Sequence, residues 1–364
     1  MGTDLSISII TPSFNRANEL GHLFQSLENQ STDPASFESI ISDDGSTDGT
    51  EALVKAWQQK AHFKIKYITQ ANQGPGAARN HGLINSEGDL ILFIDSDCEA
   101  HPDWIKTIVE EYRSAEFDAC GGPDGAKEDF TVLQKAIDYS MTSFFTTGGM
   151  RGHSDKMMAK FYPRTHNMGI TRRVYEAVGG FGDLRHGQDI EFSNRIRKSG
   201  AEVRFIKDAV VYHRRRTSLR QFFKQVFNWG VARINLGKID SAMLEPIHFL
   251  PTLASLSALL VLSGVLYLGF PVKQVFMLFF IPLCLLSLWG SVKKSDIRVF
   301  PYLLIVIPAQ VLGYGVGFFQ AFIKRYIFNQ TNPSALKRII ISDYHYTGHA
   351  PQRNIHSGRC IAPK

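Results

Sequence analysis

The feature that most constrains the fold is an apolar run, Leu90 to Ile94, followed at once by two carboxylates one residue apart. The run is short, apolar and without helical spacing, which favours a strand buried on both faces of a parallel sheet. Asp95 and Asp97 would then emerge at the carboxyl edge of that sheet, where open α/β sheets bind ligands. Two carboxylates this close repel each other unless a cation joins them, and oxygen ligands suit Mg²⁺ or Mn²⁺. We therefore expect a ligand site here; an ordinary acidic turn is the alternative.

Strand and helix patterns alternate over residues 6–96 with short links, which predicts a parallel sheet covered by helices. The expected elements are strands at 6–10, 39–42, 64–68 and 90–94, helices at about 18–30 and 50–59, and a third helix that opens near residue 73. Further strands are expected near 118–123, 166–170, 202–206 and 209–213.

Polar turns end these strands at residues 11–16 (TPSFNR) and 43–49 (DDGSTDG), and a third turn opens a helix at 73–80 (QGPGAARN). Aspartates in the second turn can accept hydrogen bonds from a base N–H or from ribose hydroxyls. The Gly74–Pro75–Gly76 turn allows close backbone approach, and its helix N-terminus with Arg79 favours a diphosphate. The Rossmann and Walker glycine patterns are absent, which argues against a dehydrogenase or an ATPase. The sequence therefore predicts a nucleoside-diphosphate site.

Residues 11–16, 43–48, 76–80 and 95–97 together resemble the family 2 glycosyltransferases, over about residues 5–235. The resemblance implies an α/β fold of the GT-A (nucleotide-diphospho-sugar transferase) type with a mostly parallel central sheet. It also implies that Asp95 and Asp97 bind the ribose and a diphosphate-bound Mn²⁺ or Mg²⁺. The donor-binding residues expected on this basis are Thr11, Pro12, Phe14, Arg16, Asp43, Asp44, Gly76, Arg79, Asp95, Ser96 and Asp97. Phe14 stands where the family often has Tyr.

The run Gly187 to Phe192 (GQDIEF) resembles the family's second catalytic motif. By that resemblance Asp189 is the general base, which takes the proton of an acceptor hydroxyl as it attacks the anomeric carbon. Gln188 replaces the family's usual Glu, which removes one charge and leaves the base in place. A single displacement of this kind inverts the anomeric centre. The alternative for Asp189 is a helix cap, a role compatible with catalysis.

Other candidate residues carry weaker signals. His213 ends a strand where the resemblance places a third metal ligand, although a lone His is more often structural. Gly122, Asn167, Gln188 and Trp229 are tentative acceptor-binding residues. Trp229 closes a QVFNW run that resembles the Q-x-x-R-W of processive polysaccharide synthases with Asn228 in place of Arg, and ordinary packing is its alternative. Residues 124–163 are expected to form acceptor loops or a lid, or a surface elaboration without catalytic consequence.

The C-terminal third has the composition of a membrane region. Residues 218–236 predict an amphipathic interfacial helix, and 249–270, 272–290 and 299–323 are long and apolar enough to span a bilayer. Three crossings are slightly favoured, although they would place Lys324 and Arg325 outside, against the positive-inside tendency. A re-entrant or surface hairpin for the last segment is the alternative.

The expected organisation is a catalytic domain at 1–216 (nucleotide half about 5–100, acceptor half about 101–216), an interfacial helix at 217–240, two to three transmembrane helices at 247–323 and a basic tail at 324–364. Four scattered cysteines (Cys98, Cys120, Cys284 and Cys360) suggest a reducing compartment. The formal charge of +6, with basic residues crowded at 214–224, suggests a membrane surface and no nucleic-acid partner.

We expect an inverting, metal-dependent glycosyltransferase that is integral to the membrane, with its catalytic domain on the cytosolic face and a bacterial inner or plasma membrane favoured. Its donor is expected to be a nucleoside-diphosphate sugar, with UDP-sugars favoured and GDP-sugars possible. The expected acceptor is lipid-linked or otherwise membrane-associated, polyprenyl-linked by preference. A processive polysaccharide synthase and a non-catalytic membrane scaffold with a nucleotide-sugar fold are the alternatives.

Overall fold

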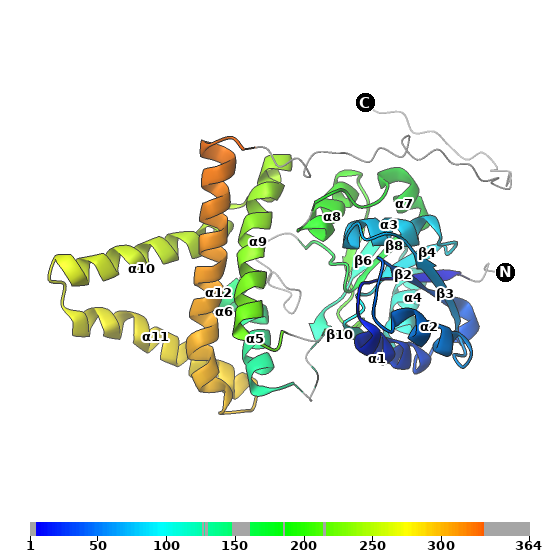
Figure 1. Cartoon of the computed structure of the whole chain (residues 1–364), viewed down its shortest axis with the longest axis horizontal. Coiled ribbons are helices and arrows are strands. Elements are labelled where there is room, and N and C mark those ends of the chain that lie inside the picture. The colour runs from blue at the N-terminus through cyan, green and yellow to red at the C-terminus, as the bar shows by residue number, and fades with distance from the viewer. Residues whose placement is uncertain are drawn as a thin grey trace.

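The computed structural model describes residues 5–125, 127, 130–147, 161–184, 186–213 and 216–330. Figure 1 shows an α/β body, a pair of long helices beside it, and two further helices that project away from the body. Parts of the sequence-based predictions lie outside the described residues, namely 148–160 of the expected acceptor loops, Arg214, Arg215 and the tail beyond residue 330.

The body is built on a seven-stranded sheet in the order β3-β2-β1-β4-β8-β6-β9. Within this sheet β8 is antiparallel to both of its neighbours and the other pairs are parallel, which confirms the mostly parallel sheet. Its strands are β1 (Ile7–Ser13), β2 (Phe37–Asp43), β3 (Lys64–Thr69), β4 (Leu90–Phe93), β6 (Ala119–Gly121), β8 (Met168–Thr171) and β9 (Val203–Phe205). A smaller sheet joins β5 (Cys98–Ala100), β10 (Val211–His213) and β7 (Asp124–Gly125).

Helices cover both faces of the large sheet, which explains why β4 is apolar throughout. Leu90 and Leu92 face one hydrophobic core, while Ile91 and Phe93 face the other. The first core is closed by α1 (Ala17–Glu28), α2 (Thr50–Gln58) and α4 (Trp104–Ser114). The second is closed by α3 (Pro75–Ile84), α7 (Arg172–Val178) and α8 (Gln188–Lys198).

The register of the strands brings their polar ends together. Ser13 pairs with Asp43, and Asp43 pairs with Thr69, so β1, β2 and β3 end level with one another. Ile10 pairs with Phe93, so the chain leaves β4 beside the last residues of β1. The turns singled out in the sequence therefore meet at one edge, as expected for parallel strands.

The region expected to be irregular, residues 124–163, contains a well-formed helix. A capping box of Thr131 and Gln134 opens α5 (Val132–Thr142), and a short α6 (Phe144–Thr147) follows. α5 buries Ala136, Ile137 and Met141 against the C-terminal helices. The expectation of loops alone was therefore wrong for this part of the segment.

Four long helices form the rest of the described chain: α9 (Leu219–Ile239), α10 (Leu250–Tyr267), α11 (Val272–Lys293) and α12 (Val299–Phe322). The single turn η3 (Pro246–Phe249) leads into α10, and a π-helical turn, η4 (Ile323–Ile327), follows α12. Pro246–Tyr267, Val272–Lys293 and Val299–Ile327 are long and apolar enough to cross a membrane, by length and composition.

Candidate active site

The turn that opens α3 is held in place by Asp44. One carboxylate oxygen accepts hydrogen bonds from the Gln70 side chain (2.8 Å) and the Gln73 backbone N–H (2.9 Å), and the other accepts from the Gly74 N–H (2.7 Å). Asp44 is buried. Asp44 therefore fixes the glycine turn whose helix N-terminus suits a diphosphate, while its contact with the nucleoside stays a prediction.

Asp43 has a similar internal role. It accepts hydrogen bonds from the backbone and the hydroxyl of Ser46 (3.1 and 2.5 Å) and from the Tyr67 hydroxyl (2.5 Å). Burial and the bond to Asp43 raise the pKa of Tyr67 well above its ordinary value, so this phenol stays a donor. Asn15, in the left-handed region at φ 52°, accepts from the Thr47 N–H at 2.8 Å and ties the first two turns together.

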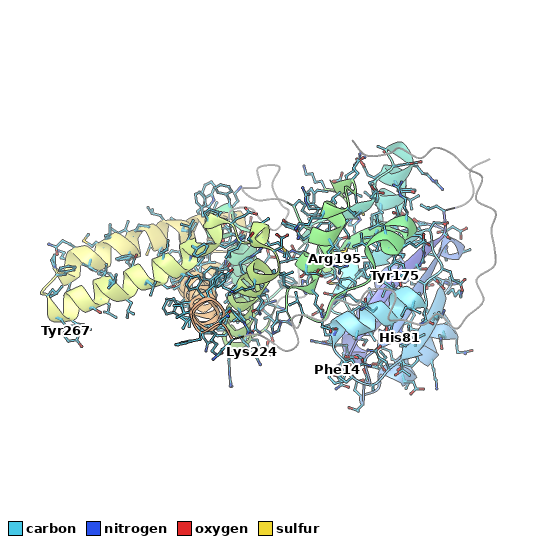
Figure 2. All side chains as sticks on the ribbon, turned by 90° about the horizontal axis from the view of Figure 1, so that it is seen from above. Phe14, His81, Tyr175, Arg195, Lys224 and Tyr267 are labelled. Atoms are coloured by element: carbon cyan, nitrogen blue, oxygen red, sulfur yellow. The ribbon has the colours of Figure 1, made fainter. Side chains whose placement is uncertain are left out.

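Phe14, the residue expected to pack on the nucleotide base, is exposed. The side chain of Phe14 is 47% exposed and is labelled at the edge of the body in Figure 2, whereas Thr11 and Pro12 are buried in β1. The hydroxyls of Thr11 and Ser13 are buried and have no partner among the described residues. The contact of Arg16 with the donor stays a prediction; its guanidinium pairs with Glu19 at 2.5 Å, and its charge helps to lower the pKa of Asp97.

Arg79 and Asp95 form an ion pair at the centre of the edge. The guanidinium Nη2 lies 2.6 Å from the Asp95 carboxylate, and the Arg79 side chain is 8% exposed. Arg79 Nε is buried without a partner among the described groups. The cation therefore lies beside the N-terminus of α3, where an added anion would meet two sources of positive potential.

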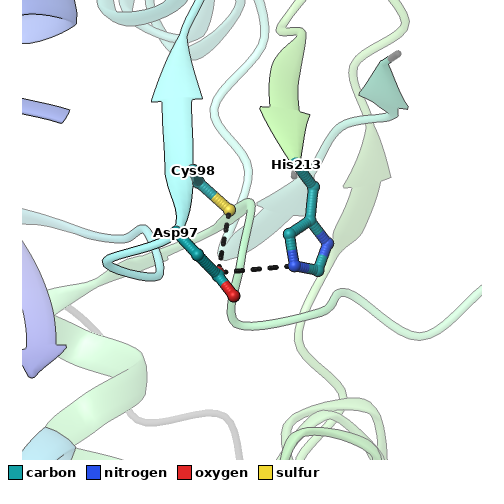
Figure 3. A group of neighbouring side chains, drawn as sticks. All are labelled: Asp97, Cys98 and His213. Atoms are coloured by element: carbon teal, nitrogen blue, oxygen red, sulfur yellow. Dashed lines mark hydrogen bonds and ion pairs between the residues drawn. The ribbon is translucent and has the colours of Figure 1, made fainter. Parts of the chain in front are cut away.

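A candidate metal centre lies where β10 meets the start of β5 (Figure 3). His213 Nε2 is 3.4 Å from Asp97 Oδ1, and the Cys98 thiol is 3.9 Å from the same oxygen. On the other side of the ring, His213 Nδ1 lies 4.0 Å from the Asp124 carboxylate and has no hydrogen-bond partner among the described residues. A carboxylate behind the ring is the arrangement that orients metal-binding histidines.

The electrostatics of this cluster suit a divalent cation. Burial opposes ionisation of Asp97, but His213, Arg216 and Arg16 outweigh it and hold the pKa well below the ordinary value. Burial and the neighbouring aspartates raise the pKa of the Cys98 thiol well above its ordinary value, so it stays protonated and is a poor ligand for Mn²⁺ or Mg²⁺. Asp97 and His213 therefore fit the metal, while Asp95 lies outside this cluster and neutralises Arg79.

Asp189 lies in the first turn of α8, opposite the donor edge. Its Oδ2 is 3.2 Å from Arg164 Nη1, and its Oδ1 accepts from the Ile190 N–H at 2.9 Å. Burial raises the pKa of Asp189, but Arg164 and Arg79 outweigh that effect and lower it below the ordinary carboxyl value. The carboxylate is thus ionised at neutral pH and can accept a proton.

Two contacts fix α8 against the donor half. A Cβ placed on Gly76 would lie 2.3 to 2.9 Å from the Gln188 side chain, so Gln188 packs directly over the glycine turn. Asn80 of α3 donates to Phe181 O (2.9 Å) and accepts from Phe181 N–H (2.7 Å), and the Phe181 ring packs on Phe192 of α8 with centroids 4.3 Å apart. The helix that carries the base and the turn expected to bind the diphosphate are therefore held as one unit.

Three of the tentative acceptor residues have structural roles in this structure. Asn167 is buried; it accepts from Trp104 Nε1 (2.9 Å) and donates to Ala209 O (2.8 Å) and Pro123 O (3.1 Å), so its side chain joins three segments of the body, and its contact with an acceptor stays a prediction. A Cβ on Gly122 would lie 2.0 Å from a backbone carbonyl, so that position is set by packing. Trp229 packs against the cluster of α5, α9 and α12, in agreement with the packing alternative.

Two residues of the site carry no recognisable signal in the sequence. Arg164 lies in an irregular segment, and nothing in its spacing links it to Asp189. Asp124 lies in a two-residue strand that only pairing with β10 defines. Ser96 is buried, and its expected donor contact stays a prediction.

The body has the GT-A type of α/β fold, with a mostly parallel central sheet. Residues 8–179 match the model of the glycosyl transferase family 2, so this part of the chain is similar to a family 2 glycosyltransferase domain. The chain is similar to the glycosyltransferase AglE of Haloferax volcanii, with 25% identity over 245 residues that cover 67% of this chain and 78% of the relative.

Two further similarities bear on function and fold. A Methanococcus voltae relative is 27% identical over 261 residues (69% of this chain, 80% of the relative) and is named a dolichyl N-acetylglucosaminyl phosphate 3-β-D-2,3-diacetamido-2,3-dideoxy-glucuronosyltransferase. The fold resembles that of the mannosyltransferase PcManGT from Pyrobaculum calidifontis, solved with GDP-Man and Mn²⁺. That match has a TM-score of 0.60 at 16% identity and covers 85% of this chain and 88% of the other.

Proposed function

We propose that this chain is an inverting, metal-dependent glycosyltransferase that moves one sugar from a nucleoside diphosphate to a membrane-associated, polyprenyl-linked acceptor. The observation that carries the proposal is the convergence of three groups on one sheet edge. Asp97 and His213 offer a divalent-metal pair, Arg79 with the α3 N-terminus offers an anion site, and Asp189 of α8 is close enough to Arg79 for that cation to lower its pKa.

The donor is proposed to bind along the edge formed by β1, β2 and β4. Phe14 packs on the base, while Arg79 and the backbone of the glycine turn hold the diphosphate. Asp97 and His213 would hold Mn²⁺ or Mg²⁺, and the bound metal would offset negative charge on the departing diphosphate. Asp124 orients the His213 ring, because it faces the nitrogen opposite Asp97.

Asp189 is proposed to act as the general base. The acceptor oxygen forms a bond to the anomeric carbon as the bond from that carbon to the diphosphate breaks, and the acceptor proton passes to the Asp189 carboxylate. Arg164 keeps this carboxylate ionised and oriented before the acceptor arrives. Attack from the face opposite the diphosphate gives inversion.

The acceptor is proposed to be lipid-linked because the base lies beside the apolar helices. Gly187, which precedes α8 at φ 84°, would place a Cβ 3.2 Å from the side chain of Leu236 of α9. The relative from Methanococcus voltae is named for a dolichyl-phosphate-linked substrate, which supports the same class here. A cytosolic location of the body follows from its use of nucleotide sugars.

The proposal is tested with detergent-purified protein, a panel of UDP- and GDP-sugars, and a lipid extract from the host membrane. Donor turnover is followed as nucleotide release with Mn²⁺, with Mg²⁺ and with EDTA. We expect lipid-dependent release from one donor that EDTA abolishes, and a product whose anomeric configuration is opposite to that of the donor.

Each other result would contradict a stated part of the proposal. Release that persists in EDTA would remove the metal role of Asp97 and His213. Donor binding without release in the presence of lipid extract would favour a non-catalytic scaffold. Repeated addition of the same sugar to one acceptor would favour a processive synthase.

A further inference from the structure

Helices α9 and α12 are packed with their backbones in contact along their length. A Cβ on Gly230 would lie 2.2 Å from the Tyr314 carbonyl oxygen, and a Cβ on Gly317 would lie 2.1 Å from the Phe227 carbonyl oxygen. Lipid cannot enter between helices that approach this closely. The position of α12 is therefore set by α9, and α9 belongs to the side of the molecule that carries the active site.

The C-terminal end of α12 is tied to the catalytic body through α9. Arg325, in the turn after α12, donates to Asn235 Oδ1 of α9 at 3.1 Å. One turn further along α9, Asp240 accepts from Asn194 of α8 at 2.7 Å and pairs with Lys198 at 2.5 Å. Since α8 also carries the catalytic base, this end of α12 lies on the catalytic side.

The N-terminal end of α12 is tied to the same side through α5. Asp296, just before α12, lies 3.1 Å from Lys135 Nζ, and Lys294 pairs with Asp138. The chain that enters α5 is itself held at the body by an ion pair between Lys127 and Glu99 of β5. A helix with both ends fixed on one side cannot cross a bilayer that has the catalytic body on that side.

Helices α10 and α11 run in a different direction. In Figure 1 they leave the α9–α12 pair and meet at a distant tip, and Figure 2 shows α12 end-on while α10 and α11 extend across the view to Tyr267. Each of the two spans, Pro246–Tyr267 and Val272–Lys293, has 22 residues. At 1.5 Å per residue this is about 33 Å, which matches a hydrocarbon core of about 30 Å.

Side-chain exposure separates α12 from the projecting helices. In the most apolar 18-residue stretch of each helix, the buried share is 11% for α10, 17% for α11 and 39% for α12. The large apolar side chains of α12 that stay exposed form one stripe at helical spacing: Tyr302, Ile305, Leu312, Val316 and Phe319. The other faces of α12 are covered by α9, α5 and α10. From α10, the Thr252 hydroxyl donates to the Gly315 carbonyl (3.3 Å) and the Ser255 hydroxyl donates to the Val311 carbonyl (3.4 Å). One lipid-facing stripe is typical of a helix that lies in the interface.

We propose that this chain crosses the bilayer twice, by α10 and α11, and that α12 lies flat on the membrane surface beside α9, so that Gln330 lies on the catalytic side. The partner of the exposed stripe is the headgroup and upper acyl region of the lipid. The three-crossing arrangement slightly favoured from the sequence is replaced, because length and hydropathy do not distinguish a crossing helix from a flat one.

The distribution of basic residues agrees with two crossings. The tip between α10 and α11 has one basic residue, Lys273, within its first turns. The basic residues at the other end of the hairpin and along the flat pair are Arg220, Lys224, Arg233, Lys238, Lys293, Lys294, Arg298, Lys324 and Arg325. With two crossings all of these lie on the catalytic side, which satisfies the positive-inside rule.

The test is cysteine labelling of the full chain in intact cells with a membrane-impermeant maleimide. The background carries Cys284→Ala and Cys360→Ser, while Cys98 and Cys120 are buried and are kept. Three exposed positions are compared: Leu268→Cys at the tip, Gln330→Cys after α12, and Gln59→Cys on the catalytic body as the matched control. We expect Leu268→Cys to be labelled in intact cells, and the other two only after lysis.

Labelling of Gln330→Cys in intact cells would show a third crossing and overturn the proposal. Protection of Leu268→Cys to the same degree as Gln59→Cys would also overturn it, because the hairpin would then not emerge. If a variant does not accumulate, the natural sequence with a C-terminal epitope replaces it: protease should remove the epitope in inside-out vesicles and spare it in right-side-out vesicles. These readouts do not depend on sugar transfer, so they separate this proposal from the proposed function.

Discussion

The donor edge and the base are held by different kinds of contact. At the donor edge, Asp43 and Asp44 are fixed by partners that lie within about 30 residues, in the next turns along the chain. Asp189 is positioned by Arg164 of a preceding irregular segment, by the turn at Gly76 and by α9, which packs under Gly187. The first arrangement is local and rigid by itself, whereas the second exists only when separate parts of the fold are assembled.

This difference implies that donor binding and sugar transfer can be separated by substitution. A change on the donor edge should weaken donor binding and stability together. A change around Asp189 should reduce transfer more than donor binding, because the hydrogen bonds that hold Asp43 and Asp44 come from residues 46–74.

The largest expected effect is that of Asp189→Asn. Loss of the general base should lower kcat by about 10²- to 10⁴-fold, while the affinity for the nucleotide sugar, measured by calorimetry, stays within error. Asp183→Asn is the matched control, since Asp183 is exposed in the loop before α8. If the Asp189 variant kept wild-type turnover, the base would have to be another residue.

The next effect concerns the metal pair on the donor side. His213→Ala should weaken Mn²⁺ binding by at least the roughly 10–100-fold that loss of a supporting metal-site residue causes. Donor binding should weaken with it, measured by titration of Mn²⁺ at fixed donor. His22→Ala, at an exposed position of α1, is the control. Unchanged Mn²⁺ affinity in the His213 variant would remove this residue from the metal site.

The substitution Asp44→Ala tests whether the donor edge is rigid by its own contacts. It leaves the N–H groups of Gln73 and Gly74 without their buried acceptor, which should cost about 1–3 kcal/mol of unfolding free energy. The donor KM should rise as the turn loosens. Asp208→Ala, an exposed carboxylate, should leave both quantities unchanged. An Asp44 variant of full stability would show that the turn holds without this residue.

The smallest effect is a shift in pH dependence on the acceptor side. Asp189 has a lowered pKa, so activity requires its ionised form and is lost as the pH falls through that lowered value. Arg164→Met removes the main cation that opposes burial, so the pKa of Asp189 rises and the acidic limb of kcat/KM moves to higher pH. Arg113→Met, an exposed position of α4, is the control. An acidic limb that does not move would separate Arg164 from the base.

The sequence predicted the donor half well because its signals are local. The apolar run at Leu90 requires a strand buried on both faces, and parallel strands bring their ends to one edge whatever the details of packing. The same local signals predict that Asp44 contacts the ligand. A carboxylate in a turn looks the same in the sequence whether it binds a nucleoside or the N–H groups of its own chain.

What the sequence did not predict depends on tertiary packing. Arg164 and Asp189 are 25 residues apart in the sequence, and Asp124 and His213 are 89 residues apart. No periodic pattern in the sequence connects the members of either pair. The direction of α12 is set by glycines that allow α9 to approach its backbone, and a hydropathy pattern does not contain direction. Asn167 is of a residue type that often binds ligands, but its side chain makes three hydrogen bonds within the protein. These bonds depend on the tertiary fold.

The contact between Gly187 and Leu236 has a consequence for how transfer depends on the membrane. The helix that carries the proposed base rests on α9, and the proposed flat arrangement places α9 and α12 on the lipid surface. A lipid environment that disturbs this pair would disturb the support of the base, while the turn fixed by Asp44 would still hold the nucleotide sugar. Transfer would therefore respond to the composition of the bilayer more strongly than donor binding does.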